Sequence, residues 1–296
     1  MEKINVALIG HGYWGSKLEK YIKENKNFNL RRICNSKSNL EEIWNDKKIT
    51  SIIEATCNES RYSVVKSALI GGKNVLTEKP LALKSKQCEE LRKIAQDNNL
   101  ELMVDYTHTF SLALNKAEKI VRKGEIGAIK CVELAIKHLG RFGGGNAYQL
   151  LGSHMLSILD MFIPIRDLYF EKRDLVKYRG QVETGIISFK NKNISGQIFV
   201  SLNYPGKYTN VTIYGNRGSI IYNPLSQPSL HIEKYKREKW IVGAKLPKKI
   251  ANYYYDESNN LRYTLEHFLD VLNEKGKSNV ERAVQITKVL EKFENN

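Results

Sequence analysis

Three glycines near the N-terminus have the spacing that binds a phosphate group. Gly10, Gly12 and Gly15 form a G-x-G-x-x-G pattern that follows an apolar stretch and precedes a helical one. The first glycine permits a tight turn, the second lets the backbone approach a pyrophosphate, and the third lets the helix pack on the strand. The helix N-terminus adds unpaired N–H groups and a partial positive charge. We predict a dinucleotide site made by Gly10, His11, Gly12, Tyr13, Trp14 and Gly15. A glycine turn without a ligand is the alternative.

The residue after the second predicted strand bears on the choice of nicotinamide cofactor. An NAD-preferring site carries Asp or Glu there, which binds the ribose 2′-hydroxyl. This chain has Asn35, followed by Ser36 and Lys37. A carboxylate would repel a 2′-phosphate, whereas an amide, a hydroxyl and an ammonium can bind one. We therefore expect NADP(H) to be favoured, with NAD(H) possible because Asn35 can also bond to a ribose hydroxyl.

The first hundred residues contain the elements that must position these groups. Short apolar segments predict strands at residues 4–9, 30–34, 51–56, 74–77 and 101–105. Amphipathic segments between them predict helices, most clearly at residues 13–24, 62–70 and 84–97. Alternating strands and helices with short connections indicate parallel strands joined by right-handed crossovers. The sequence therefore predicts an α/β fold whose N-terminal Rossmann domain, residues 1–107, has a doubly wound parallel sheet.

The pattern changes beyond residue 107. Helical periodicity is found at residues 111–123, 154–162, 261–273 and 279–293. Alternating segments predict strands at residues 129–137, 182–189, 195–202, 210–214 and 219–222. Residues 108–296 are therefore expected to form a second, α+β domain that binds substrate and mediates oligomerisation, with a large and mainly antiparallel sheet.

Several segments resemble the Gfo/Idh/MocA oxidoreductases. Residues 72–82, with the sequence GKNVLTEKPLA, resemble the signature of that family's fourth strand. The other similar segments follow in the same order along the chain: residues 56–59, 105–110, 143–145, 152–154 and 261–268. The resemblance thus extends over nearly the whole chain.

The resemblance implies hydride transfer between a nicotinamide and a carbinol or ketone carbon. It places Thr56, Asn58, Glu78, Lys79 and Pro80 beside the cofactor. It makes Lys79 and His154 the catalytic residues, with substrate over the nicotinamide between them. An ammonium or imidazolium there can stabilise the alkoxide or exchange its proton. Without the resemblance, Lys79 would be a loop lysine and His154 a helix cap or a packed ring.

The chain departs from the family pattern near His154. Many members have an Asp four residues earlier, where this chain has Leu150. Leucine cannot transfer a proton or orient an imidazole. Either Lys79 and His154 suffice, or Tyr148 or a substrate hydroxyl replaces the acid, or the chain has lost the chemistry. Our hypothesis is the first of these.

Further residues could bind the substrate. His108 lies where the chain enters the second domain, and a buried hinge contact is equally compatible with its position. Arg141 could hold a phosphate or carboxylate. The predicted substrate-binding residues are Lys79, His108, Arg141, Tyr148 and His154.

Composition excludes several classes of protein. The 296 residues are 42% hydrophobic and 27% charged, which indicates a globular protein and not a disordered one. The net charge of +15 comes from lysines scattered over the chain, so we expect no nucleic-acid partner. No apolar run is long enough to span a membrane and no leader is evident, which favours a cytoplasmic protein. Four widely spaced cysteines predict no metal site.

The sequence thus predicts an NAD(P)-dependent oxidoreductase. The expected substrate is a sugar or a nucleotide-linked sugar, since residues 107–110 resemble family members of surface-polysaccharide pathways and the positive charge suits a diphosphate. One alternative is a non-catalytic sensor that binds NAD(P), and another is an imine or bilin-type reductase. The resemblance also implies a homodimer or homotetramer.

Overall fold

The computed structural model describes residues 3–139, 145–235 and 247–294, and it divides into two compact units. Unit 1 contains Met1–Thr107 and Asn260–Asn296, and unit 2 contains His108–Asn259. The sequence predicts that everything after residue 107 belongs to the second domain, whereas the structure places the C-terminal segment in unit 1. Its two helices, α7 (Asn260–Leu272) and α8 (Val280–Glu294), pack on helices of unit 1. An amphipathic pattern specifies a buried face but not the partner of that face.

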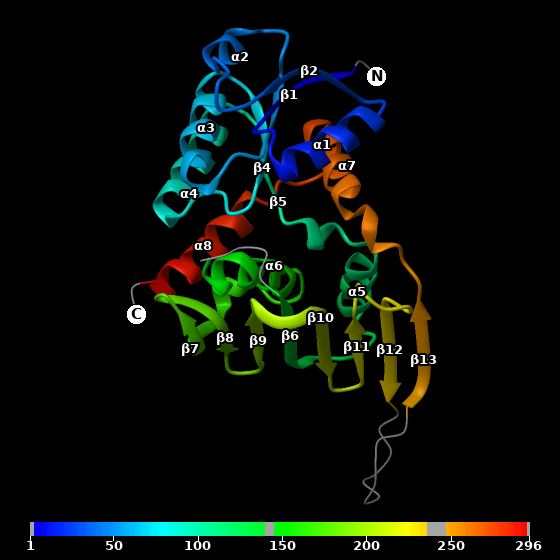
Figure 1. Ribbon diagram of the computed structural model, residues 1–296. Coiled ribbons are helices and arrows are strands. Elements are labelled where there is room, and N and C mark those ends of the chain that lie inside the picture. The colour runs from blue at the N-terminus through cyan, green and yellow to red at the C-terminus, as the bar shows by residue number, and fades with distance from the viewer. Residues whose placement is uncertain (1–2, 140–144, 236–246, 295–296) are drawn as a thin grey trace, which may run out of the picture. The chain divides into compact units, whose positions relative to one another are not determined.

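Unit 1 contains a five-stranded parallel sheet in the order β2-β1-β3-β4-β5 (Figure 1). The strands are β1 (Ile4–Ile9), β2 (Phe28–Cys34), β3 (Ser51–Glu54), β4 (Asn74–Glu78) and β5 (Leu102–Asp105). The helices between them are α1 (Tyr13–Glu24), α2 (Glu41–Asn45), α3 (Asn58–Ile70) and α4 (Ser85–Asp97). The predicted doubly wound sheet is confirmed, because nearly continuous apolar strands with helices between them can be buried only between two helical layers.

The order of the strands determines where a ligand can bind in unit 1. The chain passes from β1 outward to β2, then returns to β3 on the other side of β1. The loops that follow β1 and β3 therefore diverge at the carboxyl end of the sheet. Ligands of open α/β sheets bind at such a point, and the glycine turn follows β1.

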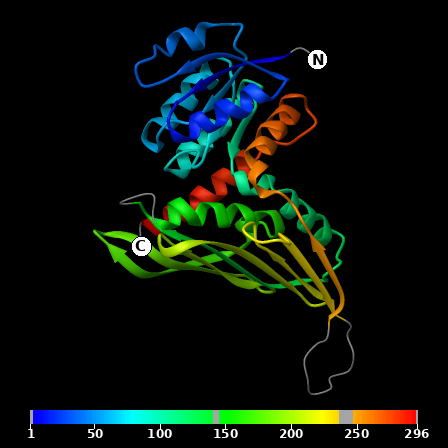
Figure 2. The same cartoon turned by 45° about the vertical axis from the view of Figure 1, so that its right-hand side comes forward.

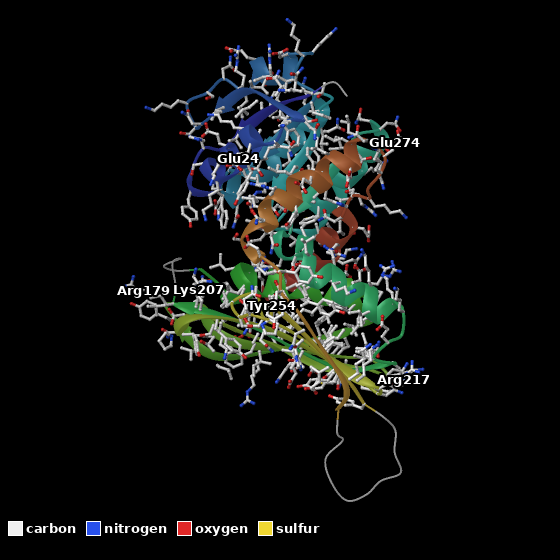
Figure 3. The ribbon with its side chains drawn as sticks, turned by 90° about the vertical axis from the view of Figure 1, so that its right-hand side faces the viewer. Glu24, Arg179, Lys207, Arg217, Tyr254 and Glu274 are labelled. Carbon is white, nitrogen blue, oxygen red and sulfur yellow. The ribbon has the colours of Figure 1, made fainter. Side chains whose placement is uncertain are left out.

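The C-terminal helices complete unit 1. Helix α7 packs on α1, where Arg262 donates to Glu24 at 3.0 Å, and α8 packs on α4. Glu24 is labelled in Figure 3. The segment between them covers the free edge of β5. The Asn279 amide accepts from Val104 N at 2.8 Å and donates to Val104 O at 2.7 Å, and Ser278 donates to Leu102 O. Asn279 thus supplies the two backbone partners that a sixth strand would supply.

Unit 2 contains an eight-stranded sheet in the order β13-β12-β11-β10-β6-β9-β8-β7. Among the described strands of this second sheet, only the β6–β9 pair is parallel, so the expected mainly antiparallel sheet is confirmed. The strands are β6 (Ile129–Leu139), β7 (Tyr169–Tyr178), β8 (Gln181–Lys190), β9 (Ser195–Ser201), β10 (Asn203–Gly215), β11 (Gly218–Tyr222), β12 (Leu230–Tyr235) and β13 (Pro247–Tyr253). Strands β7, β12 and β13 were not predicted.

Helices cover one face of this sheet (Figure 2). They are α5 (Leu112–Arg122) and α6 (Ser153–Phe162), with the short helix η2 (Tyr148–Gly152). The other short helices are η1 (Thr107–Phe110), η3 (Ile165–Asp167) and η4 (Glu257–Asn259). Alternate residues of β6, namely Val132, Leu134 and Ile136, are buried beneath this layer. Within the described ranges, no helix combines the length and the apolar character needed to cross a membrane.

Candidate active site

The glycine turn has the geometry that its pattern predicts. Gly10 has a φ of +92°, and a Cβ added there would lie 2.5 Å from the Ala55 carbonyl carbon. A Cβ on Gly15 would lie 2.0 Å from the Gly10 oxygen. These two positions therefore require glycine for the turn and for helix packing. A Cβ on Gly12 would meet nothing within 4 Å, so open space remains where a pyrophosphate would approach the backbone.

Helix α1 begins beside this open space without a side-chain cap. Gly12 is its N-cap, and the first turn contains no acidic residue. Both features suit an anion at the helix N-terminus. The Lys17 ammonium lies over the exposed rings of Tyr13 and Trp14, at 4.4 and 4.7 Å from their centroids. The sequence analysis missed Lys17, one helical turn from the glycines, as a charged neighbour of the turn.

His11 is directed along α1. Its Nε2 lies 2.6 Å from Glu19 Oε2, and the other oxygen of Glu19 accepts from Lys23 at 2.5 Å. These contacts lower the pKa of Glu19, with the Lys23 hydrogen bond as the larger cause. His11 is thus held by a residue outside the turn.

Asn35 and its neighbours form a tight turn after β2. Asn35 Oδ1 accepts from Lys37 N at 2.9 Å, and Asn35 N donates to Ser38 Oγ at 3.0 Å. The side chains of Asn35, Ser36 and Lys37 are exposed. Because the Asn35 oxygen serves the turn itself, its NH₂ group is the part that can donate to a ligand. The turn lies next to the glycines, since Gly10 N donates to the Cys34 carbonyl at 2.9 Å.

A buried ion pair, which was not predicted from the sequence, joins the end of β3 to the first turns of α3. Arg61 Nε donates to Glu54 Oε2 at 3.0 Å, and both side chains are buried. Thr56, which we expected beside the cofactor, donates to Glu54 through its N–H and its hydroxyl. The Asn58 Oδ1 accepts from Arg61 at 2.8 Å. The available signal was Glu54, because a charge that ends a short apolar strand must be paired when it is buried.

Three ionisable groups gather at the carboxyl ends of β4 and β5. Glu78 and Asp105 are register partners on these adjacent strands, and Lys79 N donates to Glu78 Oε2 at 3.3 Å. Burial, helped by the charge of Asp105, raises the pKa of Glu78 to about 8. Burial lowers the pKa of Lys79 to about 8 although both carboxylates oppose this shift. The peptide bond between Lys79 and Pro80 is cis.

Asp105 is the second residue that the sequence analysis missed here. Its Oδ1 accepts from Thr107 and from Thr264 of α7, both at 3.0 Å, and the side chain is 2% exposed. Burial raises the pKa of Asp105 to about 6, against the effect of these hydrogen bonds. The carboxyl of Asp105 therefore keeps its proton to a higher pH than an ordinary aspartate does.

Two of the predicted residues of unit 2 are in contact. His154 lies in the first turn of α6, His108 lies in η1, and both are partly buried. Their ring centroids are 5.0 Å apart with an interplanar angle of 88°. The edge of one imidazole thus packs on the face of the other, which restricts the orientation of both rings.

The structure also shows the surroundings of Tyr148 and Leu150 in unit 2. Tyr148 is 2% exposed, and its hydroxyl donates to Asp174 at 2.9 Å. Burial and this hydrogen bond raise the pKa of Tyr148, and its hydroxyl is directed to Asp174 in the structure. Leu150 lies against Gly145, where an added Cβ would be 2.3 Å from the leucine Cδ1. Arg141 lies outside the described residues.

The residues present fit a dinucleotide. An open space beside Gly12, the uncapped start of α1 and an exposed donor at Asn35 follow one another along the carboxyl edge of the sheet. The fold and this edge define a Rossmann unit of the kind that binds dinucleotides. Residues 34–106 match the family described as "Oxidoreductase family, NAD-binding Rossmann fold" (GFO_IDH_MocA), so the Gfo/Idh/MocA resemblance of the sequence is confirmed.

Curated relatives are similar to part of the chain. The 2,7-anhydro-N-acetylneuraminate hydratase of Mediterraneibacter gnavus is 24% identical over 143 residues, which cover 44% of this chain and 38% of that protein. The inositol 2-dehydrogenase of Salmonella typhimurium is 27% identical over 128 residues, which cover 43% and 35%. The chain thus matches little more than a third of the length of these relatives.

Solved structures are similar over nearly the whole chain. An NAD-binding oxidoreductase from Klebsiella pneumoniae has a TM-score of 0.83 at 16% identity and covers 99% of this chain and 96% of its own. A putative NADPH-dependent oxidoreductase from Desulfitobacterium hafniense has a TM-score of 0.82 at 13% identity, with 98% and 94% covered. At these identities the similarity shows the fold, and the names of the two proteins include NAD in one case and NADPH in the other.

Proposed function

We propose that this protein transfers a hydride between NADP(H) or NAD(H) and a ring carbon of a sugar or nucleotide-linked sugar. The main support for the proposal is the position of Lys79 together with its burial and its pKa. This residue is a partly buried ammonium with a lowered pKa, at the carboxyl end of β4 in an NAD-binding fold. Strongly perturbed ionisable groups at such an edge are typical of active sites.

In the proposed mechanism, Lys79 donates or accepts the proton that accompanies hydride transfer. A bound nicotinamide supplies or accepts the hydride itself. Charge then develops on the oxygen of the reacting carbon, and Lys79 Nζ donates to this oxygen. Since the pKa of Lys79 is about 8, the group can release and regain a proton near neutral pH. A reduction that needs the ammonium should therefore slow above about pH 8.

We assign His154 as a second proton-transfer group. An imidazole titrates near neutral pH, and the packing of His108 on its ring restricts its orientation. This arrangement supports the hypothesis that Lys79 and His154 suffice although Leu150 replaces the acid.

Turnover measurements on two variants test these roles. With NADPH or NADH and a panel of keto sugars, cyclitol ketones and nucleotide-linked keto sugars, Lys79→Ala should lower kcat by roughly 10²-fold or more. His154→Gln should lower kcat by about tenfold or more, because glutamine can donate a hydrogen bond but cannot exchange a proton. Lys79→Ala with wild-type turnover would remove the basis of the proposal, and an unaffected His154→Gln would remove the histidine alone.

The sugar class is supported by the relatives and by charge. The curated relatives are named for an anhydro-sialic acid and for inositol, both polyhydroxylated rings. The net charge of +15 favours a substrate that carries a phosphate or diphosphate. We therefore place nucleotide-linked sugars first in the substrate panel.

We also propose that NADP(H) is favoured over NAD(H). Asn35 presents its NH₂ group, with Ser36 and Lys37 exposed beside it, and none of these groups repels a 2′-phosphate. Asn35→Asp keeps the oxygen that accepts from Lys37 N, so the turn should persist while a negative charge replaces the donor. NADPH affinity should fall about tenfold or more, equivalent to ~1.4 kcal/mol, while NADH affinity is retained or improved.

Titrations followed by nicotinamide fluorescence at fixed ionic strength measure this effect. Asn191→Asp is the matched control, because Asn191 Oδ1 accepts from Asn193 N at 2.9 Å in a similar turn of unit 2. The control should bind NADPH as the wild type does. Equal losses of affinity in both variants would reflect net charge alone and would contradict the role of Asn35.

A non-catalytic NAD(P)-binding sensor is the second candidate function. It is favoured by the apolar contact between Leu150 and Gly145 at the position of the family's acid. A sensor would bind NADPH but would oxidise it with no member of the substrate panel.

A homodimer or homotetramer is proposed as the assembly. Large side chains remain exposed on the strands of unit 2, including Tyr169, Tyr178 and Tyr214. Contact through this sheet would bury them. Sedimentation equilibrium distinguishes these assemblies from a monomer.

A further inference from the structure

Arg61 joins four separate points around the strand ends of unit 1. Its guanidinium donates to Glu54 Oε2 at 3.0 Å, Thr56 O at 2.6 Å, Asn58 Oδ1 at 2.8 Å and Pro80 O at 3.0 Å. The first three acceptors belong to the end of β3 and the start of α3, whereas Pro80 directly follows Lys79. Arg61 therefore fastens the segment that contains Lys79 to the neighbouring strand.

Glu54, at the end of β3, neutralises the charge of Arg61. Glu54 is 1% exposed and also accepts from Thr56 and from the hydroxyl of Thr77 on β4. A buried pair that neighbouring groups also hydrogen-bond holds a fixed geometry, and removal of one partner alone is costly. The hydrogen bond from Thr77 to Glu54 connects β4 to β3 immediately before Glu78.

Resting on the proposed function of Lys79, we propose that Arg61 is a positioning residue that holds the Glu78–Lys79–Pro80 segment in place for proton transfer. A planar guanidinium donates in several fixed directions at once, which suits four acceptors on three segments. A lysine at this position would keep the charge but could not reach all four.

The charges around Lys79 support this assignment. Glu78, Asp105 and Arg61 all act on its ammonium, and Arg61 reinforces the effect of burial in lowering the pKa of Lys79. The same residue thus fixes the position of Lys79 and favours loss of its proton.

The test uses Arg61→Lys and the charge-neutral double variant Glu54→Gln/Arg61→Met. Hydrogen–deuterium exchange measured by mass spectrometry should be about tenfold or more faster in residues 78–83 of Arg61→Lys, while β5 is unchanged. Arg92→Lys is the matched control, since Arg92 pairs with Glu281 at 2.6 Å between α4 and α8. It should leave exchange in residues 78–83 as in the wild type.

The second readout is the titration of Lys79, followed by NMR of ¹³Cε-labelled lysine and assigned with Lys79→Arg. The double variant should titrate at higher pH than the wild type, whereas Arg61→Lys should stay close to it because the charge remains. Equal acceleration of exchange in residues 78–83 and in β5, or an unchanged Lys79 titration in the double variant, would show a merely structural role and overturn the proposal. Both readouts need no substrate, so loss of the oxidoreductase proposal would be seen separately in the turnover assay.

Discussion

Gly10 and Gly12 lie two residues apart in one turn, but their surroundings are opposite. A side chain on Gly10 would collide with the backbone of Ala55 and Thr56, whereas one on Gly12 would extend into open space. The fold therefore requires the first glycine, whereas the second leaves room for the cofactor phosphates that we propose to bind there. Adding one methyl group should therefore affect protein stability at Gly10 and cofactor binding at Gly12.

Alanine substitutions at the two positions should separate these roles. Gly10→Ala should destabilise the protein by roughly 3 kcal/mol or more, because both the positive φ and the close contacts oppose a side chain. Gly12→Ala should unfold at the wild-type urea concentration yet bind NADPH about tenfold more weakly. Urea unfolding and fluorescence titration measure both effects. Wild-type NADPH affinity in Gly12→Ala would contradict the assigned phosphate position.

Asp105 should make stability depend on pH. Its pKa in the folded protein is raised to about 6 from an ordinary 3.8, so between these values the folded state holds a proton that the unfolded state has lost. Stability therefore falls as pH rises from about 4 to about 6 and then levels off. An amide at this position would resemble the protonated acid, so Asp105→Asn should gain stability relative to wild type over this range, by up to ~3 kcal/mol. Parallel profiles of unfolding free energy would refute this effect.

At the scale of elements, the free edge of β5 is closed by side chains instead of a strand. Exposed edges of sheets invite pairing with other chains, and proteins protect them in various ways. Here Asn279, between α7 and α8, satisfies both backbone groups of Val104. The C-terminal helices thus protect a sheet formed by residues that come much earlier in the chain.

Removal of the Asn279 amide should expose this edge. Asn279→Ala should lower the unfolding free energy by about 1–3 kcal/mol, since two buried backbone groups lose their partner. Exchange at the Val104 amide should accelerate more than exchange at Ile52 in the centre of the sheet. Asn98→Ala, which removes an exposed bond to the carbonyl of Ile94, is the control and should cost less than about 0.5 kcal/mol. Unchanged exchange at Val104 would show that other groups protect the edge.

The sequence predicted those elements and residues whose signal is local. The glycine turn and the first sheet follow from adjacent residues and from strands that are apolar along their length. Strand β7 was not predicted because it is an edge strand and is largely exposed. In place of alternating apolar residues it has four consecutive charged residues, Glu171, Lys172, Arg173 and Asp174. Arg61 and Asp105 escaped because their importance depends on partners from other strands and from α7, which periodicity does not identify.

At the scale of the whole molecule, unit 1 is assembled from the two ends of the chain, with about 150 residues of unit 2 inserted between them. During synthesis the five strands are complete at residue 105, but Asn279 and the helices that cover them follow only after that insertion. At about 5–20 residues per second, the parallel sheet waits roughly 10–30 s with its last strand unprotected. During this interval the exposed edge of β5 is most prone to pair with a strand of another chain that is being made on the same messenger RNA. Unit 2 also has time to fold before the C-terminal helices complete unit 1.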